Sequence, residues 1–246
     1  DFVPPRIEVK ATAALPSMKP LQNNPLEVSA QYYFGPPGAN LKVTAESSLK
    51  TMSSPFAKWK GYQFGLIEEQ WSAQRFKLPD SETDAQGKAT ITTKVDIEPQ
   101  TTHPLQLETN VTVFEVGGRG QSTKNSTLFW HQPYLIGLSP RFKDNLSGSN
   151  TDAEFNVIAV NQQGELLPTQ NLRYALYEEQ HDYVWFRSGT NWQYEVITRD
   201  NIITNGTLTL EGKAPTLFKV PVKYGSYRLE VLDEKSGVAS SIRFAA

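Results

Sequence analysis

The sequence of 246 residues contains no cysteine and no long apolar run. The absence of cysteine excludes a disulfide framework, a thiolate metal site and a cysteine nucleophile. No run of about 18 apolar residues is present, so the sequence predicts no membrane-spanning segment and no direct membrane insertion. The formal net charge is only -2. Without a basic stripe or a polybasic segment, neither nucleic acid nor an anionic membrane is an expected partner.

The sequence also lacks an initiating methionine and a signal peptide. It begins at Asp1 and continues Phe2-Val3-Pro4-Pro5, so we expect an excised fragment or a mature chain. The composition is 38% hydrophobic and 20% charged, which is typical of an ordered soluble protein. This length accommodates one large domain or two domains of about 120 residues.

Alternation of apolar and polar residues dominates the chain. In residues 6–11, for example, Ile7, Val9 and Ala11 fall on one face of an extended segment. The same pattern predicts strands with one buried face in residues 26–30, 89–95, 105–108 and 111–114. Helical spacing is not sustained for more than about two turns, so we expect almost no helix.

The order of the predicted strands indicates that one domain ends and a second one begins near Gln132-Pro133. Residues 127–130 are typical of a closing strand, and residues 134–138 of an opening one, with Gln132-Pro133 between them. Strands at short spacing with glycine-containing turns favour antiparallel β-sandwiches. We therefore predict two immunoglobulin-like β-sandwich domains in tandem, 1–132 and 133–246. We interpret the less regular residues 47–83 as extended loops and short strands covering the sandwich.

Candidate sites for metals or catalysis are weak. The cluster Glu178, Glu179, His181 and Asp182 places only Glu179 and His181 on one strand face, too few ligands for a closed zinc site. The oxygen-rich loop at residues 144–152 lacks EF-hand spacing and is better interpreted as a surface turn. No nucleophile elbow or phosphate-binding loop occurs. We expect no cofactor, no metal and no enzymatic activity.

An aromatic hairpin is the main candidate interface. Tyr183 and Trp185 share one strand face, residues 188–191 make a turn, and Trp192 and Tyr194 share a face of the return strand. Cross-strand aromatic pairs stabilise hairpins by about 0.2–1 kcal/mol each. The favoured interpretation is an aromatic ladder packed in or against the domain, with at least one tryptophan in its core. The alternatives are a contact surface for a neighbouring domain or partner and a sugar-stacking platform.

The strand near the C-terminus has a clear predicted register. Tyr227, Leu229 and Val231 alternate with Arg228 and Glu230. We predict that the three apolar residues point inward and that Arg228 is a plain surface position.

Several motifs, taken in order, resemble those of bacterial alpha-2-macroglobulins. They cover the opening at residues 1–9, the aromatic strand and turn at 30–41, and Tyr134-Leu135-Ile136-Gly137-Leu138. They continue through the hairpin 182–186 with Trp192, and through the segments 224–233 and 239–244. Together they look like the two macroglobulin-like domains that precede the bait region, the fifth and the sixth.

The resemblance implies a structural scaffold in a larger protease trap. A protease cuts the bait region, the molecule rearranges, and an internal Cys–Gln thioester bonds to the attacker. Residues 68–70 and 178–180, both Glu-Glu-Gln, resemble the end of the thioester motif. The chain has no cysteine, so it cannot form the thioester. The implied partners are proteases through the full-length protein, neighbouring macroglobulin-like domains and a cell-wall polymerase.

The resemblance also implies a periplasmic location, with the full-length protein anchored to the inner membrane as a lipoprotein. The alternative function is a β-sandwich binding module of a surface adhesin or carbohydrate-binding protein.

Overall fold

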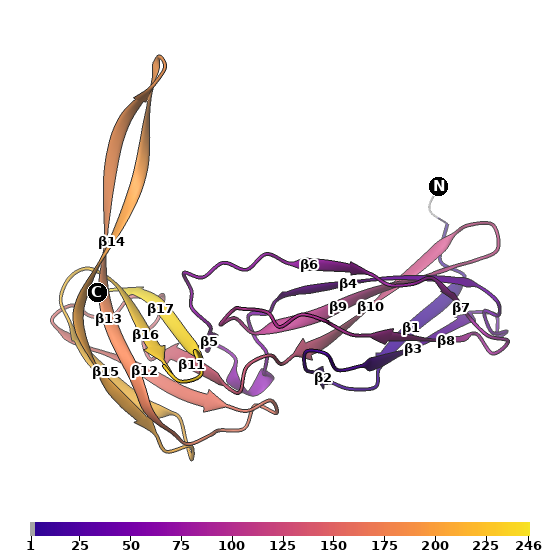
Figure 1. Cartoon of the computed structure of the whole chain (residues 1–246), viewed down its shortest axis with the longest axis horizontal. Coiled ribbons are helices and arrows are strands. Elements are labelled where there is room, and N and C mark those ends of the chain that lie inside the picture. The colour runs from indigo at the N-terminus through magenta and orange to yellow at the C-terminus, as the bar shows by residue number, and fades with distance from the viewer. Residues whose placement is uncertain (1–2) are drawn as a thin grey trace. The chain divides into compact units, whose positions relative to one another are not determined.

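The computed structural model describes residues 3–246, and these are almost entirely β-structure (Figure 1). The predicted all-β class is confirmed: the described chain has seventeen strands, and its one helical element is a short 3-10 helix at Ala57–Trp59. No helix in residues 3–246 has the length and apolarity to cross a membrane. Asp1 and Phe2, the first residues of the opening motif, lie outside the described residues.

The chain forms two compact units that are discontinuous in sequence. The first contains the residues up to Met52, then 71–100 and 104–131; the second contains 53–70, 101–103 and 132–246. The chain therefore passes between the units five times, after Met52, Gln70, Gln100, His103 and His131. Our linear division into 1–132 and 133–246 stays a prediction. What the structure adds is that part of the first half of the sequence packs with the second unit.

The first unit is a sandwich of two antiparallel sheets. One sheet has the order β1 (Ile7–Ala13), β3 (Asn24–Tyr32), β8 (Lys88–Thr93). The other has the order β2 (Ser17–Met18), β10 (Gly120–Phe129), β9 (Leu105–Phe114), β4 (Lys42–Thr51), β6 (Gln74–Lys77), with β7 (Ser81–Glu82) also on β4. The short β2 pairs parallel to β10, and the other pairs are antiparallel.

The core of the first unit follows directly from the alternation in its sequence. Ile7 and Val28 from one sheet pack with Val43, Val111 and Val113 from the other, and all are buried. Their strand neighbours face the other way, because successive side chains alternate across a strand. The predicted strands in this half are therefore present with the predicted faces inward.

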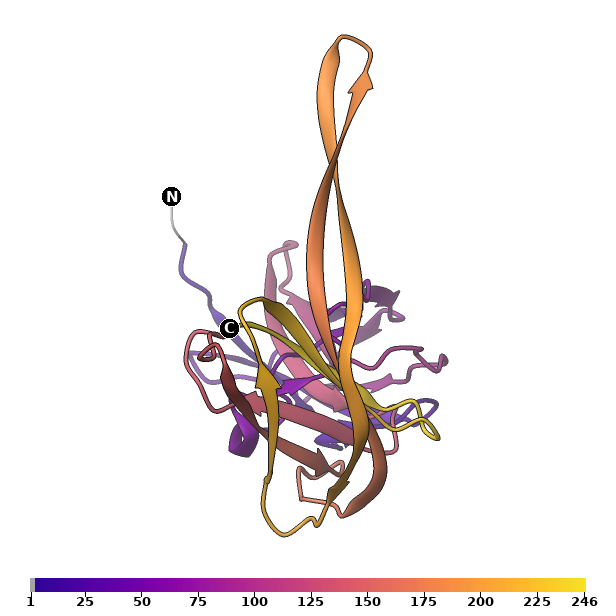
Figure 2. The same ribbon diagram turned by 90° about the vertical axis from the view of Figure 1, so that its left-hand side faces the viewer.

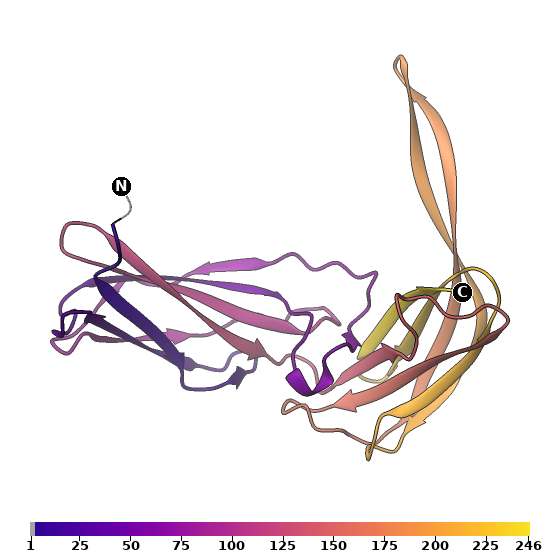
Figure 3. The same cartoon turned by 180° about the vertical axis from the view of Figure 1, so that it is seen from behind.

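The second unit is also a sandwich, seen most clearly in Figures 1 and 3. One sheet has the order β15 (Thr216–Val222), β12 (Thr151–Val160), β11 (Leu135–Pro140), β5 (Gln63–Phe64). The other has the order β14 (Asn191–Leu210), β13 (Thr169–Ser188), β16 (Ser226–Leu232), β17 (Ala239–Ala245). Its core includes Tyr227, Leu229 and Val231, which are buried as predicted.

Residues 53–70, which we call the strap, complete the second unit. β5 within the strap pairs with β11, and a side chain at Gly137 would collide with the Phe64 ring. Trp59 donates its indole N–H to the Gly164 carbonyl at 2.7 Å. The backbone N–H of Gly65 donates to the Ser240 hydroxyl at 2.8 Å. We interpreted 47–83 as loops and short strands, but residues 47–51 continue the long strand β4.

Candidate interaction surface on an exposed β-ribbon

Strands β13 and β14 form a ribbon that extends far beyond the sheet from which it starts. Each strand has 20 residues, and their register is continuous from the Tyr177–Ile202 pair to the Ser188–Asn191 pair. β16 pairs with β13 only as far as Glu178. Figures 1 and 2 show the two strands projecting alone from their sandwich. We call residues 181–198 the outer ribbon and the remainder of β13 and β14 the inner ribbon.

A two-residue turn closes the outer ribbon. Gly189 is the first of the two residues between Ser188 and Asn191, and its φ is 64°. Glycine takes a positive φ at little cost, and two-residue turns with this conformation match the right-handed twist of a hairpin. The local sequence therefore accounts for a tight and regular hairpin.

The four predicted interface residues lie together on the outer ribbon and face solvent. The exposed fractions are 63% for Tyr183, 60% for Trp185, 67% for Trp192 and 56% for Tyr194. Trp185 and Tyr194 are direct cross-strand partners with ring centroids 5.2 Å apart. The ladder exists, but the favoured interpretation, that it packs in or against the domain with at least one tryptophan in the core, is wrong. The reason is that the strands leave the sandwich before they reach these residues. A role as an interface stays a prediction.

The two faces of the outer ribbon differ in chemistry. Cross-strand partners share a face, so the aromatic face also carries Val196 and, nearest the turn, Arg187 opposite Trp192. Arg187 is the only Asp, Glu, Lys or Arg on that face of the outer ribbon. The opposite face mixes apolar and charged groups, namely Val184, Phe186, Ile197, Asp182 and Glu195.

A cluster of charges around the buried residues Arg228 and Glu179 lies where the ribbon leaves the sheet. Arg228 is 7% exposed, and it contacts Glu179 at 2.5 Å and Asp200 at 2.9 Å. Its Nε lies 3.5 Å from Glu68 of the strap. Arg243 of β17 makes a second contact with Glu179 at 3.0 Å. We call these five residues the charge cluster. The prediction that Arg228 is a plain surface position is wrong, because the strap and two neighbouring strands cover it.

The register of the strands explains why these charges need one another. Glu179 and Asp200 are direct cross-strand partners, and like charges in that position repel. Arg228 contacts both carboxylates, and its guanidinium also lies 4.7 Å from the centroid of the Tyr177 ring. Burial by itself would lower the pKa of Arg228, but the hydrogen bonds to Asp200 and Glu179 outweigh it and raise the pKa.

Glu230, two residues along β16, lies near the same charges. Burial raises the pKa of its carboxyl, and the negative charges of Glu68 and Asp200 also raise it, which together outweigh the lowering by the positive charge of Arg228. With Glu230 included, the region has more acidic than basic side chains. The charged form of Glu230 is therefore destabilised in the fold.

The other predicted ligand candidates do not assemble into a site. Glu179 is occupied by two arginines, and His181 contacts Thr198 with 3.2 Å between Nδ1 and Oγ1. No group of three or more His, Asp or Glu residues within 3–246 is arranged to hold a metal. In the loop at residues 144–152, Asp144 and Asn150 have positive φ values, as turn residues of this type tolerate.

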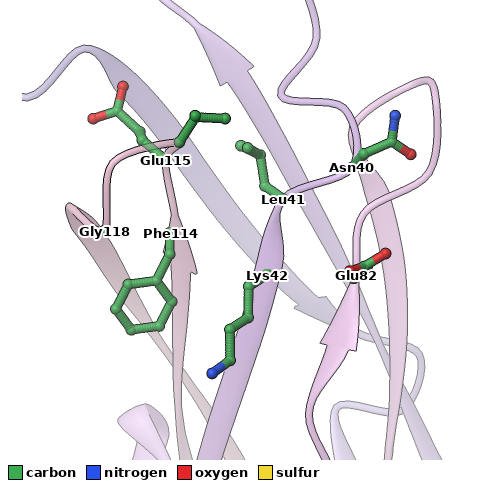
Figure 4. A pocket seen from close by; sticks show the side chains of 8 residues that line it. Asn40, Leu41, Lys42, Glu82, Phe114, Glu115 and Gly118 are labelled. Carbon is green, nitrogen blue, oxygen red and sulfur yellow. The ribbon is translucent and has the colours of Figure 1, made fainter.

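Each unit has a surface pocket large enough for a small ligand. The first unit has one of about 410 Å³, lined in part by Lys42, Phe114 and Glu115 (Figure 4). In that view the charged ends of Lys42 and Glu115 point apart, and Glu115 is instead paired with Arg6 at 3.3 Å. The second unit has one of about 680 Å³ beside Ile203 and Tyr227. Neither pocket brings together a nucleophile, a base and an oxyanion donor.

Two antiparallel β-sandwiches with immunoglobulin-like layering define the class of this chain. Residues 5–130 match the family described as the bacterial alpha-2-macroglobulin MG5 domain. Residues 137–246 match the family described as bacterial macroglobulin domain 6. The chain belongs to the bacterial alpha-2-macroglobulin family and carries its fifth and sixth macroglobulin domains. The resemblance in the sequence motifs, including the order of the domains, is confirmed.

Known relatives agree with this assignment along the whole chain. An alpha-2-macroglobulin of Xylella fastidiosa is 26% identical over 248 residues, which is 100% of this chain and 15% of the relative. The Escherichia coli alpha-2-macroglobulin is 24% identical, again over 100% of this chain and 16% of the relative. The chain therefore spans about one sixth of the length of these relatives.

Solved structures show the same fold. The Salmonella alpha-2-macroglobulin reacted with methylamine has a TM-score of 0.81 and 25% identity, covering 100% of this chain and 17% of that one. The E. coli protein activated by porcine elastase has a TM-score of 0.79 and 25% identity, covering 100% of this chain and 22% of that one.

Proposed function

We propose that this chain is a non-catalytic scaffold within a larger protein that traps proteases. The observation that carries the proposal is the match of both units to consecutive macroglobulin domains of alpha-2-macroglobulins. Solved structures of one such relative, the E. coli alpha-2-macroglobulin, are described as activated by porcine elastase and as trypsin activated. The family match also favours the scaffold over the alternative of an adhesin or carbohydrate-binding module.

The chemistry of the chain supports a mechanical role. It has no cysteine, so a thioester that bonds to a protease has to come from another part of the full-length protein. The chain crosses five times between its two units, and the strap is anchored by backbone and side-chain hydrogen bonds within the second unit. The strap therefore makes residues from the first half of the sequence part of the second unit, which is consistent with a structural role.

Location and partners follow from the same proposal. The full-length protein resides in the periplasm, anchored to the inner membrane as a lipoprotein. Its partners are the trapped proteases, the neighbouring macroglobulin domains and a cell-wall polymerase. The outer ribbon, with Tyr183, Trp185, Trp192 and Tyr194, serves as a contact surface in this assembly. Exposed apolar patches of this kind mark interaction sites in soluble proteins.

Protease challenge of the full-length protein and of this chain alone tests the proposal. On incubation with elastase, the full-length protein should give a covalent adduct on a denaturing gel. The 246-residue chain should give none and should leave cleavage of a large protein substrate unchanged. Stoichiometric inhibition by the chain alone would contradict the scaffold role. Absence of any adduct with the full-length protein would contradict the trap.

A further inference from the structure

The edge of β13 in the outer ribbon is unusually open to pairing. From His181 to Ser188, β13 pairs with β14 on one side and has no described strand on the other. The two register shifts in β13, at 169/172 and 176/177, both lie in the inner ribbon. Natural sheets protect free edges with charged side chains, lysine above all, and with proline or bulges. Between His181 and Ser188 there is no lysine, proline or bulge, and the charged residues Asp182 and Arg187 lie on either side of an uncharged stretch at 183–186.

The side chains on this edge also favour pairing. Residues 183–186 are Tyr-Val-Trp-Phe, so both faces of the strand are apolar there. The facing stretch of β14 is different, because Gln193 and Glu195 interrupt its apolar residues. Exposed segments of high β-propensity without charge are the ones that recruit another strand. The free edge of β13 is therefore better suited than that of β14 to pair with an added strand.

We propose that the outer edge of β13, from His181 to Ser188, binds an extended polypeptide segment by strand addition. The occupant has apolar side chains at alternating positions and a carboxylate near Arg187. This inference rests on the proposed function, in which the outer ribbon is a contact surface.

Two observations select this occupant. The edge continues the line along which β16 already pairs with β13 up to Glu178, so an added strand extends an existing ladder. On the aromatic face Arg187 is the only Asp, Glu, Lys or Arg, and its Nε donates to the Gly189 carbonyl at 3.1 Å. An acidic group on the partner complements the remaining charge of the guanidinium.

Binding of synthetic peptides to the 246-residue chain tests the proposal. The probe is a blocked nine-residue peptide of alternating valine and threonine with one glutamate near its end, titrated while tryptophan emission is recorded. A fully N-methylated copy keeps the side chains but loses the amide donors, and should bind at least about tenfold more weakly. A copy with lysine in place of glutamate should bind about threefold to tenfold more weakly.

A matched pair of variants locates the binding edge. Trp185→Ser removes an aromatic ring from β13, whereas Trp192→Ser removes an equally exposed ring from β14. Trp185→Ser should weaken peptide binding about tenfold, and Trp192→Ser should change it less than about threefold. Equal losses in both variants, or unchanged binding of the N-methylated peptide, would show that the aromatic face and not the edge is the site.

Three further outcomes would overturn the proposal. The first is no binding of any peptide at millimolar concentration. The second is binding to vesicles of phosphatidylethanolamine and phosphatidylglycerol that both tryptophan variants abolish, which would assign the ribbon to a lipid surface. The third is a dimer in sedimentation velocity that Trp185→Ser disrupts, which would make a second copy the occupant. A negative peptide result beside a normal elastase adduct refutes this inference alone and leaves the trap intact.

Discussion

The inner and outer halves of the β13–β14 ribbon share the same two strands and almost the same register, yet they have opposite environments. In the inner ribbon Leu172 and Leu176 are fully buried in the sandwich core. In the outer ribbon Trp185 and Trp192 are exposed. Strand pairing alone therefore does not decide burial. What decides it is whether a second sheet and neighbouring strands cover the faces and edges of the pair.

The charge cluster lies at the transition between the two halves. Glu179 and Asp200 form one of the last strand pairs before the outer ribbon, and Arg228 of β16 and Arg243 of β17 both contact Glu179. The strap adds Glu68 from a distant part of the sequence. We infer that the cluster fixes the base of the ribbon, so that the outer half projects in a defined direction from its own sandwich.

Removal of Arg228 should have the largest effect on stability. Arg228→Ala leaves Glu179 with Arg243 as its remaining partner and Asp200 with no arginine, and breaking the buried Arg228–Glu179 pair costs about 3–5 kcal/mol. Urea unfolding of the second unit measures this loss. Arg199→Ala is the matched control, because the Arg199–Asp182 pair is exposed and should contribute at most about 1 kcal/mol. Similar costs for the two variants would contradict a special role for the cluster.

The charge cluster also marks the limit of what the sequence predicts. The alternation in residues 227–231 correctly identifies Tyr227, Leu229 and Val231 as buried, because a strand period of two needs only local information. Arg228 is misassigned because a charged residue in an alternating strand normally faces water. Its carboxylate partners lie 28 to 160 residues away, and no local pattern connects them.

The same limit applies to the strap and the aromatic hairpin. The irregular sequence of residues 53–70 gives no local sign that these residues pack with the second unit. The hairpin and its aromatic pairs are predictable from Tyr183, Trp185 and the turn at Gly189. Their exposure is not, because it depends on where β16 stops pairing with β13, which is a property of the tertiary fold.

Truncation of an apolar side chain should have a much larger effect on stability in the inner ribbon than in the outer ribbon. Leu176→Ala removes a fully buried group from the inner ribbon and should cost about 2–5 kcal/mol. Val184→Ala, in the outer ribbon of the same strand, should change stability by about 0.5 kcal/mol or less. Thermal or urea unfolding measures both. A large cost for Val184→Ala would mean that the outer ribbon is covered within this chain.

Glu230→Gln should give a small gain in stability that depends on pH. The pKa of Glu230 is raised in the fold, so the folded chain favours the protonated form and the charged form is destabilising. The gain should be complete at neutral pH, where the native carboxyl is charged. It should vanish as the pH falls below the pKa of the unfolded chain, about 4.3, because both states are then protonated. A gain that is the same at pH 3 and pH 7 would exclude an electrostatic cause.

Substitution of the exposed tryptophans should have the smallest effect on stability. A buried tryptophan replaced by alanine typically costs about 3–5 kcal/mol, but Trp185 and Trp192 contact the rest of the chain mainly through cross-strand neighbours. Trp185 loses its ring contact with Tyr194, and cross-strand pairs contribute about 0.2–1 kcal/mol. Each alanine variant should therefore melt within a few degrees of the parent chain. The same variants should differ in binding, since only Trp185 lies on β13, the strand whose edge is proposed to bind. A drop in melting temperature of ten degrees or more for either variant would restore the core-ladder interpretation and remove the basis for treating the outer ribbon as an interaction surface.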